Sequence, residues 1–177
     1  MKKRVLLLHG WGGSDSPHWQ SWLASEIAKD YGTVSFLKFS DFDFPNKNRW
    51  KEELLKELVD FKPNIVICHS LANILWFHLC NEENIKDVEK LFLVAVPSLK
   101  CEVEEIKSFF PVKAPKNLHA KEVLLVASTN DSYMTQDEAK EVQTLLGVEM
   151  EILVDAGHIN SDSGYGEWPW MLNKIKG

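Results

Sequence analysis

The chain has 177 residues, of which 45% are hydrophobic and 26% are charged, and its formal net charge at pH 7 is -6. This size and composition are typical of one compact globular domain with a buried core, so we expect a single domain over residues 1–177. The negative charge argues against nucleic acid or an anionic membrane as the main partner, because both are bound by basic surfaces.

The first predicted element is a strand at residues 4–8, with the sequence RVLLL. This apolar run is too short for the core of a signal peptide, and it is followed by His9 and Gly10 rather than by a small-residue cleavage site. No later apolar run approaches the ~20 residues that a membrane-spanning helix needs. We therefore expect no membrane partner.

Further strands are predicted by apolar, β-branched runs at residues 33–37, 64–68, 91–96, 123–127 and 149–154. Apolar residues recur at helical spacing in the segments 19–27, 50–58, 71–79, 139–146 and 168–175. Ser16 followed by Pro17 predicts the start of the first helix, and Thr135 with Glu138 has the form of a capping box. The alternation predicts an α/β fold in which about six parallel strands are covered by helices on both faces.

Two longer segments interrupt this alternation, at residues 41–48 and 97–121, and the second contains a predicted short helix at residues 102–110. The cysteines, Cys68, Cys80 and Cys101, are odd in number and form no C-x-x-C pair, which favours a reducing cytoplasm. No cluster of histidine, cysteine and carboxylate residues has the spacing of metal ligands, so we expect neither a metal nor a cofactor.

In an open parallel sheet, ligands bind at the carboxyl ends of the strands, so the residues that follow each strand are the most informative. The first strand is followed by a glycine-rich stretch, HGWGGSD. It matches neither the dinucleotide-binding pattern nor a phosphate-binding loop. Its glycines permit a sharp turn that presents the Trp11 N–H group to a developing oxyanion, although a plain turn remains the alternative.

The third strand runs into a serine in the stretch NIVICHSLAN. A nucleophile elbow has the pattern G-x-S-x-G, and here Cys68 and Ala72 replace both glycines around Ser70. Both replacements are small, so the backbones can still approach closely, and the Leu71 N–H group would point toward a bound oxyanion. Taken alone, a serine in this position is more often only a helix N-cap.

An acid and a histidine follow the last two predicted strands. Asp131 comes after the fifth strand and His158 after the sixth, so both belong to the sheet edge that carries Ser70. The order serine, acid, histidine is that of the α/β-hydrolase triad, and this combination favours catalysis over three unrelated turn residues. Asp155 and Asp137 are weaker candidates for the acid.

The other histidines and Cys68 have less suitable positions. His69 is expected to pack beside the nucleophile, and Cys68 to be a buried, inert thiol. His18, His78 and His119 occupy helix or loop positions without matching partners.

With these residues assembled, the chain resembles the small serine hydrolases of the retinoblastoma-binding protein 9 and YdeN group, within the α/β-hydrolase superfamily. The matching blocks are VLLLHGWGGSDSPHWQSWL, IVICHSLA, LLVASTNDSYM and AGHINSDSGYGEWP. The resemblance implies Ser70 as nucleophile, Asp131 as acid and His158 as base. It also implies a sheet of six parallel strands in the order 2-1-3-4-5-6, and the length of the chain leaves no room for a large cap domain. The chain departs from the group at Cys68, where glycine is common, and its LKCEV stretch is not an L-x-C-x-E motif.

The sequence therefore predicts a cytoplasmic, carboxylesterase-like serine hydrolase that acts on small-molecule acyl substrates, as a monomer or weak homodimer. Its oxyanion hole would consist of the Trp11 and Leu71 N–H groups. The pocket walls are expected to include Trp11, the 97–121 segment, Met134 and Ile159, and Trp168 is expected to pack the last helix against the His158 loop. A non-catalytic protein-binding module and an acyltransferase remain the alternatives.

Overall fold

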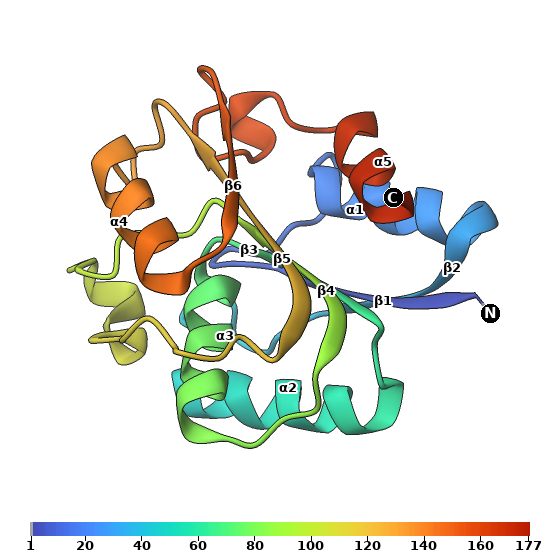
Figure 1. Ribbon diagram of the computed structural model, residues 1–177, viewed down its shortest axis with the longest axis horizontal. Coiled ribbons are helices and arrows are strands. Elements are labelled where there is room, and N and C mark those ends of the chain that lie inside the picture. The colour runs from blue at the N-terminus through green and yellow to red at the C-terminus, as the bar shows by residue number, and fades with distance from the viewer. Residues whose placement is uncertain (1) are drawn as a thin grey trace.

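The computed structural model describes residues 2–177 and is built around one parallel sheet with the strand order β2-β1-β3-β4-β5-β6 (Figure 1). The strands are β1 (Lys3–Leu8), β2 (Gly32–Leu37), β3 (Ile65–His69), β4 (Val88–Val94), β5 (Ala120–Ser128) and β6 (Glu149–Leu153). Every neighbouring pair is parallel. The predicted α/β-hydrolase strand order is therefore confirmed.

Helices cover both faces of the sheet, as the alternation of elements predicts. They are α1 (Trp19–Glu26) with its π-helical continuation η1 (Ile27–Tyr31), α2 (Lys47–Phe61), α3 (Leu71–Glu82), α4 (Gln136–Leu146) and α5 (Pro169–Lys176). The 3-10 helices are η2 (Glu104–Phe109) and η3 (Ser161–Ser163). In Figure 1, α1 and α5 lie on one side of the sheet, and α2 and α3 lie on the other.

The two faces of the sheet contribute to two separate apolar cores. In β1, Val5 and Leu7 pack with residues of α1 and α5, whereas Leu6 and Leu8 pack with residues of α2, α3 and α4. All four side chains are fully buried. A strand buried on both faces loses the polar alternation of a half-exposed strand, which explains the continuous apolar runs.

The start of the first helix differs from the prediction at Ser16 and Pro17. Helix α1 begins at Trp19, and its N-cap is His18, whose Nδ1 atom accepts a hydrogen bond from the Gln20 N–H group at 3.2 Å. Histidine is an unusual N-cap, so the sequence pattern misses this boundary. The predicted capping box of Thr135 and Glu138 is present at the start of α4.

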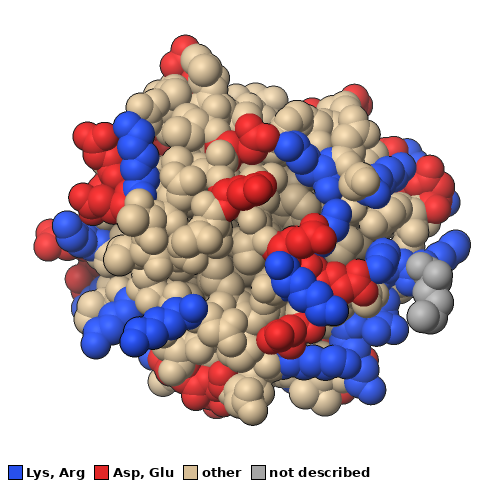
Figure 2. Space-filling view, viewed as in Figure 1, with Lys and Arg blue, Asp and Glu red and all other residues tan. Residues whose placement is uncertain are grey.

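Charged side chains of both signs are interspersed over the face in Figure 2. Several form ion pairs, such as Lys174 with Glu151 at 2.8 Å. Within residues 2–177, no helix is both long and apolar enough to cross a membrane.

Candidate active site

Ser70 lies in a strained turn between β3 and α3. Its backbone has φ 53° and ψ −123°, a conformation that residues other than glycine rarely adopt. Hydrogen bonds hold this turn from both sides: the Ser70 N–H group donates to Val94 O at 3.0 Å, and Asn73 Nδ2 donates to Ser70 O at 2.8 Å and to Val94 O at 2.9 Å. The turn is therefore fixed by the strands and helix around it.

The side chain of Ser70 does not cap α3, although a helix N-cap is the commonest role of a serine at this position. Its Oγ atom instead lies 2.7 Å from His158 Nε2. The small residues on either side, Cys68 and Ala72, are both fully buried. Burial raises the pKa of the Cys68 thiol well above its ordinary value. The expected burial of Cys68 is thus confirmed, and its low reactivity stays a prediction.

The glycine turn after β1 packs directly against Ser70. A Cβ atom at Gly10 would lie only 2.7 Å from Ser70 Cβ and 3.2 Å from the Leu71 nitrogen, so only glycine allows this approach. The turn is held by the loop before α2: the Gly12 N–H group donates to Phe42 O, and Trp11 Nε1 donates to Asp43 O, both at 3.0 Å.

Trp11, which follows Gly10, and Leu71, which follows Ser70, both line the pocket around Ser70. Neither N–H group donates a hydrogen bond to a residue of the described chain. Two such donors beside a serine hydroxyl group are suited to binding an oxyanion.

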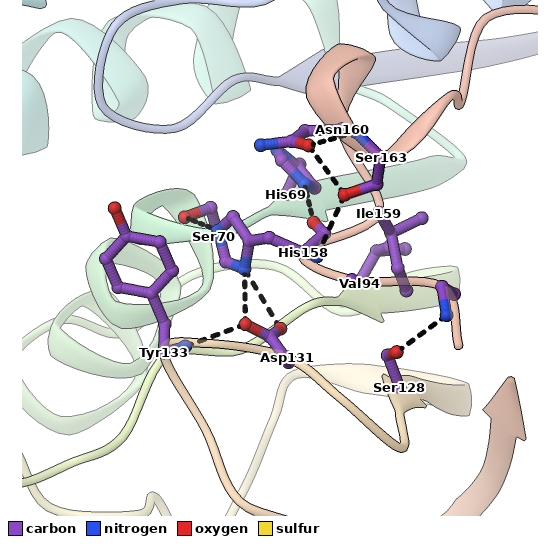
Figure 3. A network of polar contacts seen from close by, with 12 residues as sticks. His69, Ser70, Val94, Ser128, Asp131, Tyr133, His158, Ile159, Asn160 and Ser163 are labelled. Atoms are coloured by element: carbon purple, nitrogen blue, oxygen red, sulfur yellow. Dashed lines mark hydrogen bonds and ion pairs between the residues drawn. The ribbon is translucent and has the colours of Figure 1, made fainter. Parts of the chain in front are cut away.

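His158 lies between Ser70 and Asp131 (Figure 3). Its Nδ1 atom is 2.9 Å from each carboxylate oxygen of Asp131, opposite the Nε2 contact with Ser70. The Asp131 side chain is only 3% exposed and also accepts a hydrogen bond from the Tyr133 N–H group at 2.8 Å. The structure thus brings together the three predicted residues in one hydrogen-bonded chain.

The loop that carries His158 is anchored by side chains on both sides of it. Asn130 Oδ1 accepts a hydrogen bond from the Gly157 N–H group at 2.7 Å, and Ser163 Oγ accepts one from the His158 N–H group at 3.2 Å. These contacts set the position of the imidazole relative to β5 and η3.

The two alternative acids do not contact the histidine. Asp155 is exposed, and its backbone N–H group donates to Thr129 Oγ1 at 2.9 Å. Asp137 lies in α4, where its carboxylate is 3.5 Å from the Lys140 ammonium group. Asp131 is therefore the carboxylate that faces His158.

A pocket of about 240 Å³ opens over Ser70 and His158. As predicted, its wall includes Trp11 and residues of the 97–121 segment, namely Pro97 and Ile106. The prediction for Met134 and Ile159 is wrong, because both side chains point into the core and are 5% and 0% exposed. Their sequence neighbours Tyr133 and Asn160 line the pocket instead.

A larger hollow of about 740 Å³ lies over β4, β5 and β6. It is lined by charged residues such as Lys90, Glu122 and Lys174, and it contains none of Ser70, Asp131 and His158. Ser70 and His158 line the smaller pocket and not this one.

Two further histidines lie beside His158. His18, which the sequence placed without partners, lines the pocket, and burial lowers its pKa to about 4. His69 ends β3 and packs as predicted, with its Nε2 atom 3.1 Å from His158 O, and burial lowers its pKa well below the ordinary value. Both side chains are therefore neutral near pH 7.

Trp168 supports the same loop through Trp19. The two indole rings are 5.1 Å apart edge to face, and Trp19 Nε1 donates to Ile159 O at 2.8 Å.

No group of three or more histidine, cysteine or carboxylate residues within residues 2–177 is arranged to hold a metal ion.

A parallel sheet of this order, with a serine on a tight turn between the third strand and its helix, defines the α/β-hydrolase class. The sequence matches the serine hydrolase family over residues 5–176, and the chain belongs to that family of hydrolases. A search of curated proteins found no match.

Solved structures share the fold at low sequence identity. The ydeN gene product of B. subtilis is 17% identical and superimposes with a TM-score of 0.86, over 99% of this chain and 97% of that chain. A YdeN-like hydrolase from Pectobacterium atrosepticum is 23% identical with a TM-score of 0.81, over 98% and 89%. The carboxylesterase CesB of Bacillus subtilis is 10% identical with a TM-score of 0.65, over 98% and 82%. The YdeN part of the family resemblance is therefore confirmed.

Proposed function

We propose that this hydrolase cleaves small carboxylic esters or related acyl substrates, with Ser70 as nucleophile, His158 as base and Asp131 as the acid of the triad. The observation that carries the proposal is the hydrogen-bonded chain from Ser70 Oγ through both nitrogens of His158 to Asp131. A carboxylate can only accept, so His158 Nδ1 carries the proton. The Nε2 lone pair is then free to take the proton of the Ser70 hydroxyl.

The proposed first step is attack of Ser70 Oγ on the substrate carbonyl while His158 Nε2 takes its proton. Asp131 stabilises the imidazolium that forms, without itself becoming protonated. The negative charge moves to the carbonyl oxygen, where the N–H groups of Trp11 and Leu71 would bind it. Such a donor typically stabilises the transition state by about 3–4 kcal/mol.

His158 then protonates the leaving alcohol, and an acyl-enzyme remains on Ser70. Water, activated by the same imidazole, attacks the acyl carbon and releases the acid, which regenerates the free hydroxyl. Both half-reactions use the same groups in the same positions.

The pocket supports small, uncharged substrates. Its volume of about 240 Å³ is modest, and its lining contains no lysine or arginine of the described chain. Asp162 is the one carboxylate among the described lining residues, so an anionic substrate would be repelled rather than bound. The carboxylesterase named above shares the fold, which agrees with an ester substrate.

A fluorophosphonate probe tests the proposal, because it labels only an activated serine. We expect the folded wild-type protein to be labelled and Ser70→Ala to remain unlabelled. A folded wild type that does not react, or a Ser70→Ala variant that reacts equally well, would contradict the proposal and favour a protein-binding module.

Hydrolysis and acyl transfer are separated by their products. We expect p-nitrophenyl acetate to yield acetate even when small alcohols or amines are present. Predominant formation of their acetyl derivatives would indicate an acyltransferase instead. The cytoplasmic location and the oligomeric state stay predictions of the sequence.

A further inference from the structure

Asn160 has a side-chain nitrogen that the fold itself does not use. The residue is the N-cap of η3, and its Oδ1 atom accepts hydrogen bonds from the Ser163 N–H group at 3.1 Å and from Ser163 Oγ at 2.9 Å. Because a backbone N–H group must donate to an acceptor, the atom that faces Ser163 is the oxygen. The Oδ1 atom of Asn160 therefore stabilises the turn, whereas its NH₂ group has no role in the turn.

The NH₂ group of Asn160 is available to a ligand. Nδ2 donates no hydrogen bond to any residue of the described chain, and it is not among the fully buried polar atoms that lack a partner. Asn160 lines the same pocket as Ser70 and His158. Figure 3 shows its oxygen turned toward Ser163 and its nitrogen turned the opposite way.

A chain of hydrogen bonds fixes this orientation. The His158 N–H group donates to Ser163 Oγ at 3.2 Å, and the Ser163 hydroxyl in turn donates to Asn160 Oδ1. The backbone carbonyl oxygen of Asn160 also accepts hydrogen bonds from the N–H groups of Ser163 and Tyr165, at 3.1 and 3.0 Å. The side-chain amide is thus held in place before any substrate arrives. The hydrogen bonds that its oxygen accepts polarise the amide and make its NH₂ group a stronger donor.

The position of Asn160 indicates which part of a substrate it would meet. His158 must deliver a proton to the leaving oxygen, so the leaving group lies next to His158 Nε2. The carbonyl oxygen lies on the other side, against Trp11 and Leu71. Asn160 follows His158 by two residues, and both line the same pocket. We therefore infer that its amide meets the part of the substrate next to His158, which is the leaving group.

We propose that Asn160 Nδ2 binds an uncharged acceptor oxygen, such as an ether or hydroxyl oxygen, in the alcohol part of the ester. The inference rests on the proposed function and names its preferred leaving group. A neutral amide donor suits a neutral acceptor, and the described lining residues provide no cation that would bind a carboxylate. An alkyl leaving group of the same size would leave the donor unpaired, which disfavours it.

The test uses two acetate esters of equal length. In 2-methoxyethyl acetate an ether oxygen replaces the third methylene carbon of the alcohol in butyl acetate. The selectivity is the ratio of their kcat/KM values, each divided by the rate of hydroxide-catalysed hydrolysis of the same ester. We expect the wild type to prefer the methoxyethyl ester, and Asn160→Ser to reduce this selectivity by about three- to tenfold, as expected for one neutral hydrogen bond.

The choice of variants separates contact from loop support. Serine can keep the N-cap acceptor for Ser163 while it removes the amide donor. Asn130→Ser is the matched control, because Asn130 holds the same loop through Gly157 but does not line the pocket. We expect Asn130→Ser to lower turnover of both esters equally and to leave the selectivity unchanged. If Asn160→Ser does not fold, Asn160→Asp preserves both acceptor bonds and should lose the selectivity as well.

Each outcome is decisive. The inference would be overturned by unchanged selectivity in the folded Asn160 variant, or by an equal loss of selectivity in Asn130→Ser. In either case, cleavage of the esters by the wild type would still uphold the proposed function. A second pair, methyl 3-methoxypropanoate and methyl pentanoate, places the ether oxygen in the acyl part. If Asn160→Ser changes only this pair, the assignment to the leaving group is wrong. If the wild type neither reacts with fluorophosphonate nor cleaves any of these esters, the proposed function and this inference fall together.

Discussion

The Nδ1 atom of His158 lies 2.9 Å from both carboxylate oxygens of Asp131, whose side chain is almost completely buried. Under the proposed mechanism, this carboxylate holds the imidazole in the tautomer that can accept a proton from Ser70. An amide at position 131 can donate to Nδ1 and would stabilise the opposite tautomer. We therefore expect Asp131→Asn to lower kcat for p-nitrophenyl acetate by about 10⁴-fold.

Asp155→Asn provides the matched control, because it removes an equal charge from the adjacent turn. The Asp155 side chain is exposed and makes no hydrogen bond to His158. Its replacement should change kcat by less than about twofold, since the Coulomb interaction of an exposed carboxylate is screened by water and salt. A large loss in Asp155→Asn together with a small loss in Asp131→Asn would reverse the assignment of the acid.

Gly10→Ala should disturb the turn that carries Ser70. The added Cβ atom would lie 2.7 Å from Ser70 Cβ, so one of the two backbone segments must move. We expect a loss of about 1–3 kcal/mol in the free energy of unfolding from overpacking. Displacement of the N–H groups of Trp11 and Leu71 should also lower kcat, by about 10²-fold for a shift near 1 Å.

Gly147→Ala separates this effect from ordinary loss of stability. Gly147 ends α4 with φ 65° and has open space around its Cα atom. Alanine there costs about 1 kcal/mol of backbone strain and should leave kcat unchanged. Denaturant unfolding and ester turnover, measured on both variants, would distinguish them. An equal kcat for Gly10→Ala and the wild type would show that the contact with Ser70 is not needed.

The strand order and the clustering of Ser70, Asp131 and His158 could be anticipated from sequence because they depend on topology. Parallel strands all end at one edge of the sheet, so residues that follow different strands meet there. The apolar run places the start of β4 at residue 91, whereas the strand begins at Val88. Val88 and Lys90 join the sheet through backbone pairing with β5, and that pairing does not require apolar side chains.

The pocket wall depends on side-chain directions that topology does not fix. In the turn after Asp131, the structure turns Tyr133 outward and Met134 inward, and after His158 it turns Ile159 inward and Asn160 outward. Apolar side chains such as those of Met134 and Ile159 are suited to a pocket wall, but here both are buried in the core. His18 reaches the pocket only because α1 packs beside the sheet edge, a tertiary contact without a local sequence signal.

Cys68→Ala tests whether the elbow needs the cysteine that replaces its usual glycine. Cys68 is fully buried between Leu8 and Leu93 of the neighbouring strands. Removal of its sulfur should lower the free energy of unfolding by about 1 kcal/mol through a small cavity. The Ser70 turn is held by Val94 and Asn73, so kcat should stay within about twofold of the wild type.

Thiol reagents provide a second measurement on the same residue. The raised pKa and complete burial of Cys68 predict that it stays unmodified in the folded protein, while the partly exposed Cys101 reacts. Mass spectrometry after brief iodoacetamide treatment would locate the adduct. Modification of Cys68 before Cys101, with loss of activity, would contradict the prediction.

The buried histidines should make the fold sensitive to acid at pH values that begin well above those at which most carboxylates titrate. Burial lowers the pKa of His18 to about 4, and it also lowers the pKa values of His69 and His9. In the unfolded chain each histidine has a pKa of about 6.5. Between these values the unfolded state binds more protons than the folded state, so the free energy of unfolding falls as the pH decreases from about 6.5 toward 4.

His18→Asn is the variant that isolates one of these groups, because asparagine retains an N-cap acceptor for Gln20 without a titrating ring. The lowered pKa of His18 corresponds to roughly 3 kcal/mol of acid destabilisation across this range. Urea unfolding at pH 7 and pH 4.5 should therefore show a smaller difference for His18→Asn than for the wild type. The ion-paired carboxylate of Glu82, whose pKa is lowered to about 2 by Lys51, loses its stabilising effect only below about 4.5 and does not interfere. Equal pH dependence in both proteins would mean that His18 takes up its proton in the folded state as readily as in the unfolded chain.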